Sequence, residues 1–137
     1  MRWADQLIKL SNFEVEVLQK RLAEVVERRC AAEIRLAVLI AEGEAEAAKA
    51  REDALAGWYH AGFLEGLKQR KVRAQADIDS AAHEEAGARD ALAEAFETLK
   101  KYEQVAESAR TAAGREERRR ETVALDEIGL RRAAGGR

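Results

Sequence analysis

The sequence predicts an all-α protein, a long antiparallel two-helix coiled-coil hairpin, and three observations support this fold class. The 137 residues include no proline, so nothing in the chain forces a long helix to end. Charged residues make up 36% and aromatic residues only 5%, which favours a thin helical assembly over a thick core. Apolar residues recur at alternating spacings of three and four, the pattern of a coiled-coil seam. We expect a single domain over residues 1–137.

The first helix is expected over about residues 4–56. Its seam consists of Val15, Leu18, Leu22, Val25, Arg29, Ala32, Leu36 and Leu39. Arg29 is the one charged residue among these positions. Ser11 followed by Glu14 matches a capping box. The helix therefore either begins near Asp5 or restarts at Ser11.

The turn between the helices is expected at residues 57–66. This segment contains three glycines and the bulky aromatic residues of the middle of the chain: Gly57, Trp58, Tyr59, Gly62, Phe63 and Gly66. Each glycine costs about 1 kcal/mol relative to alanine inside a helix. A turn near residue 60 predicts that Leu39 lies near Ala81.

The second helix is expected over about residues 67–131, followed by a frayed tail at residues 132–137. Its seam steps by four and three through Leu67, Lys71, Ala74, Ile78, Ala81, Glu85, Ala88, Leu92, Ala95, Leu99, Tyr102, Ala106, Ala109 and Ala113, and the rhythm extends through Glu116, Arg120, Val123, Glu127 and Leu130. An unbroken seven-residue repeat predicts a left-handed supercoil. The many alanines allow the two backbones to approach closely.

We expect no enzymatic activity, metal or cofactor, because the residues that such chemistry needs are not placed together. His83 lacks the second histidine four residues on that a zinc-binding helix uses. Asp77 and Asp79 are two residues apart and point to different sides of a helix. Cys30 is the single cysteine, which rules out an internal disulfide and fits a reducing compartment. We therefore interpret the chain as a binding protein.

The charge and apolar content predict a cytoplasmic protein. The formal net charge is −2, so no global field attracts the chain to nucleic acid or to an anionic membrane. No apolar stretch approaches the roughly 20 residues that span a bilayer. The start of the chain also lacks the apolar core of a secretory signal.

Two clusters are candidates for partner binding, each with a structural alternative. The first is a set of arginines interleaved with glutamates: Arg115, Arg118, Arg119 and Arg120. It is either a solvated helix face with pairs such as Glu116–Arg120, or a docking face for an acidic partner. Nucleic acid is a weaker reading, because no aromatic platform accompanies the arginines. The second cluster, Trp58, Tyr59 and Phe63, either plugs the tip of the hairpin or forms an exposed binding patch.

Several motifs, taken in order, resemble the FliJ family of the bacterial flagellar type III export apparatus. They are Leu7–Leu10 with Glu14–Glu16 and Leu22, then Trp58 with Phe63, Leu64 and Leu67, then Glu117–Glu121 with Leu125–Glu127 and Arg131–Arg132. Trp3-Ala4 together with Leu18–Leu22 is similar to alphaproteobacterial members. The resemblance covers nearly the whole chain, and it rests on the order and spacing of motifs that are weak individually.

This resemblance implies a non-enzymatic, stalk-like role in flagellum biogenesis, type III protein export and therefore motility and chemotaxis. The implied partners are the export ATPase FliI, the export gate protein FlhA and export chaperones, and the protein would couple the ATPase and the proton motive force to export. It would be cytoplasmic and peripheral at the inner membrane through these partners. The gate-binding candidates are Trp58, Tyr59, Phe63, Leu67, Arg70 and Ala74, where Arg70 and Ala74 depart from the family pattern. The ATPase-binding candidates are Arg115, Arg118, Arg119 and Asp126.

Three other interpretations remain open from the sequence. The chain could be a generic cytoplasmic coiled-coil scaffold, or a YscO-like component of another type III secretion system. A nucleic-acid-associated helical protein is the third reading, and salt-dependent retention on DNA would support it.

Overall fold

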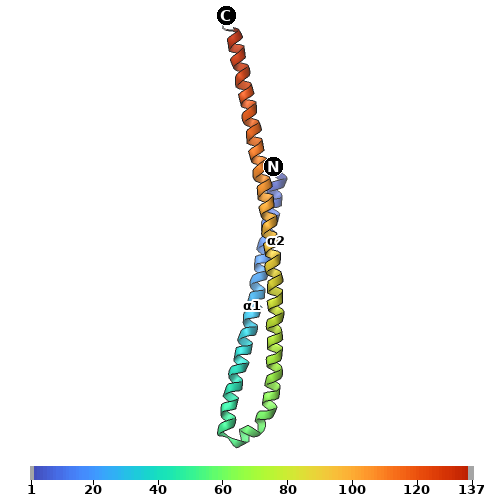
Figure 1. The fold of residues 1–137 in the computed structure, drawn as a ribbon, viewed down its shortest axis with the longest axis vertical. Coiled ribbons are helices and arrows are strands. Elements are labelled where there is room, and N and C mark those ends of the chain that lie inside the picture. The colour runs from blue at the N-terminus through green and yellow to red at the C-terminus, as the bar shows by residue number, and fades with distance from the viewer. Residues whose placement is uncertain (1, 136–137) are drawn as a thin grey trace. The chain divides into compact units, whose positions relative to one another are not determined.

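A computed structural model describes the backbone of residues 2–135 and the side chains of residues 2–53 and 59–135. Two helices, α1 (Arg2–Glu52) and α2 (Ala54–Gly135), account for nearly all of these residues, and the described part contains no strand (Figure 1). The predicted all-α fold class is therefore confirmed. The chain forms two compact units, Glu16–Ala93 and Met1–Val15 with Glu94–Arg137, which are described separately.

In the unit Glu16–Ala93, the two helices pack against each other in antiparallel directions, with the chain reversing at the bottom of the view in Figure 1. Ion pairs join Arg28 to Glu84 and Arg35 to Asp77, so higher numbers on α1 meet lower numbers on α2. The buried residues follow the predicted seam: Val25, Ala32, Leu39, Leu67, Ala74, Ala81 and Ala88. Small side chains at most of these positions let the two helices lie close together.

The predicted turn at residues 57–66 is wrong, because the chain reverses earlier. Asp53 alone separates α1 from α2, and residues 57–66 belong to α2. The Asp53 amide donates to the Lys49 carbonyl oxygen at 3.1 Å, which completes the last turn of α1. Among the described residues no glycine adopts a positive φ, so the glycines of this segment do not need a turn. A helix tolerates each of them for about 1 kcal/mol.

The earlier turn also corrects the predicted pairing of the two helices. Leu39 packs in one cluster with Leu67 and Ala74, whereas a turn near residue 60 predicts Ala81 as its neighbour. Ala74 and Ala81 are one heptad apart, so the helices pair one heptad away from the predicted register. The helix limits change in the same way: α1 has 51 residues and α2 has 82, and α2 includes residues 132–135 of the predicted frayed tail.

The close approach of the helices near the turn depends on Gly43. A Cβ atom at this position would lie 2.6 Å from Leu67 Cδ2, whereas a Cβ atom at Gly87 would meet nothing within 4 Å. We expect Gly87→Ala to raise the free energy of unfolding by about 1 kcal/mol through helix propensity. Gly43→Ala gains the same propensity but crowds Leu67, and overpacking costs roughly 1–3 kcal/mol. Urea denaturation compares the two variants, and equal stabilisation by both would contradict the close packing at Gly43.

In the second unit, the start of α1 packs against α2, and beyond residue 114 the described part of α2 packs against no other helix of this unit. Ala4, Ser11 and Val15 of α1 and Ala95 and Ala106 of α2 are buried. Ser11 therefore lies inside a continuous helix, and of the two predicted starts the structure shows the earlier one, at Arg2. Every described residue from 115 to 135 is exposed, and we call this stretch the terminal segment.

Candidate partner-binding surfaces

The first candidate surface lies near the start of α2 and consists of Tyr59, Phe63, Leu64 and Arg70, which we call the tip surface. Tyr59 is 64% exposed and Leu64 is 45% exposed. Phe63 is half-buried against the Leu39–Leu67 cluster, and the Arg70 guanidinium lies over its ring at 6.0 Å from the centroid. The arginine and the ring therefore form one continuous surface, on which the cation faces the electron-rich side of the aromatic ring.

The structure does not bring all of the predicted gate-binding residues to this surface. Leu67 is 2% exposed and Ala74 is 1% exposed, because both lie on the seam that faces α1. Phe63 and Arg70, also seven residues apart, lie on the neighbouring helix face, at the edge of the seam. The side chain of Trp58 lies outside the described residues. Leu64 was not a predicted site residue, although it belongs to a motif that carries the family resemblance.

The second candidate surface is the terminal segment, where the predicted ATPase-binding residues Arg115, Arg118, Arg119 and Asp126 are all exposed. Arg119 donates to both carboxylate oxygens of Glu116, at 2.8 and 3.1 Å. This hydrogen bond holds the pKa of Glu116 below its ordinary value and raises the pKa of Arg119. The predicted pair between Glu116 and Arg120 is also present, at 3.5 Å. Part of the basic cluster is thus neutralised within the helix.

Four apolar side chains on the terminal segment are exposed, and none of them is among the predicted site residues. They are Val123 at 52%, Leu125 at 68%, Ile128 at 50% and Leu130 at 71%. Val123 and Leu130 are seven residues apart and share one face of the helix. At about 100° per residue, Leu125 and Ile128 lie roughly on the opposite face. The terminal segment therefore presents apolar side chains in two opposite directions.

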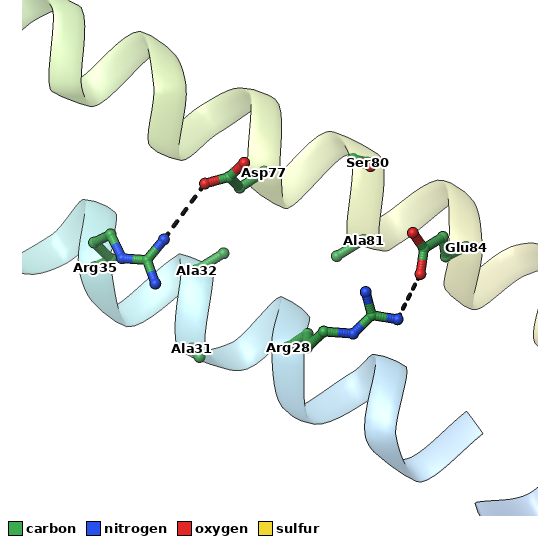
Figure 2. Close-up of a pocket in the computed structure, with 8 residues that line it drawn as sticks. All are labelled: Arg28, Ala31, Ala32, Arg35, Asp77, Ser80, Ala81 and Glu84. Carbon is green, nitrogen blue, oxygen red and sulfur yellow. Dashed lines mark hydrogen bonds and ion pairs between the residues drawn. The ribbon is translucent and has the colours of Figure 1, made fainter. Parts of the chain in front are cut away.

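A third feature is a groove between the two helices of the unit Glu16–Ala93, with a volume of about 260 Å³. Figure 2 shows Ala32 and Ala81 between two ion pairs, Arg28–Glu84 at 2.6 Å and Arg35–Asp77 at 3.4 Å. The other residues that line it are Ala31 and Ser80. In the described part of the chain, no group of three or more histidine, cysteine, aspartate or glutamate residues is placed to hold a metal ion.

A more buried ion pair joins the two helices within the seam. Arg29 Nε lies 2.7 Å from Glu85 Oε2, and the Glu85 side chain is only 12% exposed. Glu85 also accepts a hydrogen bond from Arg89 at 3.0 Å, and Arg29 donates to Glu33 at 2.9 Å. The hydrogen bond from Arg89, and to a lesser extent that from Arg29, holds the pKa of Glu85 below its ordinary value. The hydrogen bonds that Arg29 donates to Glu33 and Glu85 raise the pKa of Arg29. Arg29, the one charged residue of the predicted first-helix seam, thus pairs with Glu85 of the second-helix seam.

We expect acid to lower the thermal stability of the wild-type chain more than that of the Glu85→Gln variant. Because the pKa of Glu85 is lower in the folded chain than in the unfolded chain, its ionised form stabilises the fold at neutral pH. This contribution is lost as pH falls below about 4.3, the value of an unperturbed glutamate, through the lower folded pKa. Thermal denaturation at pH 7 and pH 3 measures the loss. A matched control is Glu65→Gln, an exposed glutamate on the same helix, and an equal acid response in both variants would contradict the role of Glu85.

No helix in the described residues is both long and apolar enough to span a membrane.

Comparison with known proteins identifies the family. No family profile matches the chain, and no solved structure is similar to it at a significant level. Two curated proteins, each named flagellar FliJ protein and found in two strains of Caulobacter vibrioides, are 55% identical to it over 137 residues. The alignment covers 99% of this chain and 99% of each relative. With such identity over the whole length, this chain belongs to the FliJ family of flagellar proteins.

Proposed function

We propose that this chain is a non-enzymatic stalk of the flagellar type III export apparatus. In this proposal it binds the hexameric export ATPase FliI through the terminal segment and the export gate protein FlhA through the tip surface. It thereby couples the ATPase and the proton motive force to substrate export, at the cytoplasmic side of the inner membrane. Export chaperones are further proposed partners. Membership of the FliJ family supports the role in flagellar export.

The terminal segment is the observation that carries this proposal. Apolar side chains exposed on two opposite faces of one helix are both removed from water only by a partner that contacts both faces. Residues 115–135 have no covering helix within their unit, and they span about 30 Å at 1.5 Å per residue. A partner that surrounds the helix, such as the channel of a ring-shaped ATPase, covers both faces at once. The exposed arginines and acids between the apolar residues supply polar contacts around the same helix.

The tip surface has the composition of a partner contact. Aromatic residues and arginine dominate the binding energy of many interfaces, and Tyr59, Phe63 and Arg70 are grouped here. Tyr59 and Leu64 project apolar area into solvent, while Phe63 is anchored against the seam. The surface is small, which suits a transient contact with the export gate.

Capture assays with purified partners test the two contacts separately. We expect Leu125→Asp with Leu130→Asp to abolish capture of FliI and to leave capture of the FlhA cytoplasmic domain unchanged. Tyr59→Ala with Leu64→Ala should give the opposite result. Val72→Asp, at a residue that is 63% exposed on α2, is a control that should retain both contacts. If the wild-type chain captures neither partner, the stalk proposal is wrong.

A further inference from the structure

The seam of the unit Glu16–Ala93 is nearly repetitive along α2. Ala74, Ala81 and Ala88 are seven residues apart and are buried to 1%, 7% and 5% exposure. If α2 slid along α1 by one heptad, Ala81 would take the place of Ala74, and Ala88 would take the place of Ala81. Packing at these alanine positions therefore distinguishes poorly between the observed register and a register one heptad away.

The slipped register is also compatible with the connection between the helices. In an antiparallel hairpin, a slip of seven residues moves the turn by half that number, from Asp53 to about residue 57. The chain would then reverse within residues 57–66, which contain Gly57, Gly62 and Gly66. Next to Gly43, Ala74 would replace Leu67, and next to Leu39, Ala81 would replace Ala74. These replacements bring small side chains to positions that already accept the larger Leu67 or an alanine.

The slipped register cannot keep the Arg29–Glu85 ion pair of the seam. Leu92 would take the place of Glu85 beside Arg29, and Leu36 would take the place of Arg29 beside Glu85. Each charge would then face an apolar side chain at a partly buried position, which is unfavourable.

The exposed ion pairs distinguish less strongly between the two registers. Arg35 would exchange Asp77 for Glu84 and remain paired. Arg28 would lose Glu84, but exposed ion pairs contribute little to stability.

We propose that the Arg29–Glu85 ion pair selects the observed register of this hairpin over a second register one heptad away, in which the chain reverses within residues 57–66. The alanines from Ala74 to Ala88 pack almost equally well in the two registers, and over this stretch the paired charges distinguish between them. A polar pair at a single seam position is an effective means of specifying register in coiled coils.

The register also determines how deeply Leu67 is buried. In the observed register Leu67 is buried against Leu39 and next to Gly43. In the slipped register it leaves both and lies beside Ala50, closer to the end of the helix pair. Leu67 is not part of the tip surface in the observed register, but the family resemblance implies that it contacts the gate, so the ion pair would keep this additional residue covered. This consequence, unlike the choice of register itself, rests on the proposed function.

Crosslinking measures the register directly. In a Cys30→Ala background, two reporter pairs are introduced at exposed positions: Ala31→Cys with Ser80→Cys, and Ala31→Cys with Gly87→Cys. Residues 31 and 80 line the same groove, and residue 87 lies one heptad further along α2, about 10 Å away. With a thiol crosslinker shorter than this shift, the otherwise unmodified chain should give only the 31–80 product. Arg29→Leu with Glu85→Leu should convert much of it into the 31–87 product.

Leucine at positions 29 and 85 keeps the seam apolar in both registers, and circular dichroism reports whether the helices remain folded. The control is Arg35→Ala with Asp77→Ala, which removes an exposed pair and should retain the 31–80 product alone. If the leucine variant is helical and gives only the 31–80 product, the ion pair does not select the register. If it gives the 31–87 product without stronger capture of the FlhA domain, the register proposal stands and the link to gate binding is wrong.

Discussion

Leu67→Ala lowers the free energy of unfolding by roughly 2–5 kcal/mol, the range for truncating a buried leucine. Leu67 is 2% exposed and packs with Leu39 and Ala74, so the substitution removes apolar contacts from the most leucine-rich part of the seam. Because only two helices meet there, the seam can close partly over the cavity, and we expect a loss in the lower half of this range. Urea denaturation followed by circular dichroism gives the value.

Leu64→Ala is the matched control for this prediction. Leu64 lies three residues earlier on the same helix and is 45% exposed, so its truncation should change the stability by less than about 0.5 kcal/mol. A second comparison uses Gly43→Ala with Leu67→Ala, in which the added methyl group enters the space that Leu67 leaves. We expect this double variant to recover part of the lost stability. Equal effects of Leu67→Ala and Leu64→Ala would show that Leu67 is not buried in solution.

Truncation after Gly114 is expected to abolish capture of the export ATPase while the melting temperature of the remaining hairpin stays within a few degrees. All described residues of the terminal segment are exposed, so the truncation removes no buried seam residue. Three ion pairs in the segment, Arg119–Glu116, Arg120–Glu116 and Arg131–Glu127, join residues of the same helix. Thermal denaturation and the capture assay measure the two effects on one sample.

Deletion at the other end of the same unit provides the contrast. Removal of residues 2–15 deletes Ala4, Ser11 and Val15, which are buried to 1%, 4% and 6% exposure. We therefore expect this deletion to lower the melting temperature, although it removes fewer residues than truncation after Gly114. If truncation of the terminal segment lowers the melting temperature as much as deletion of residues 2–15, the segment packs against the rest of the chain.

The candidate surfaces show how far sequence reasoning reaches for binding residues. Arg115, Arg118, Arg119 and Asp126 are exposed, as charged residues on an uncovered stretch of helix are, and their role in binding the ATPase stays a prediction. The family resemblance groups Leu67 and Ala74 with exposed residues, because the linear order of a motif does not show which helix face the partner helix covers. The seven-residue repeat does not single out Leu125 and Ile128, because both lie off it, although Leu125 belongs to a family motif.

The amino-acid pattern by itself determined that the chain is helical, where its seam lies and which charged residues interrupt that seam. These properties depend on local spacing, because a heptad repeat specifies the same helix face wherever the partner helix lies. Only the tertiary structure decided where the chain reverses, which register the helices adopt and which part of α2 remains uncovered. Alanines repeated every seven residues pack almost equally well in neighbouring registers. The register therefore depends on other contacts between residues that are distant in the sequence. Arg29 with Glu85 and Gly43 with Leu67 are such contacts, and neither is visible until the two helices are placed side by side.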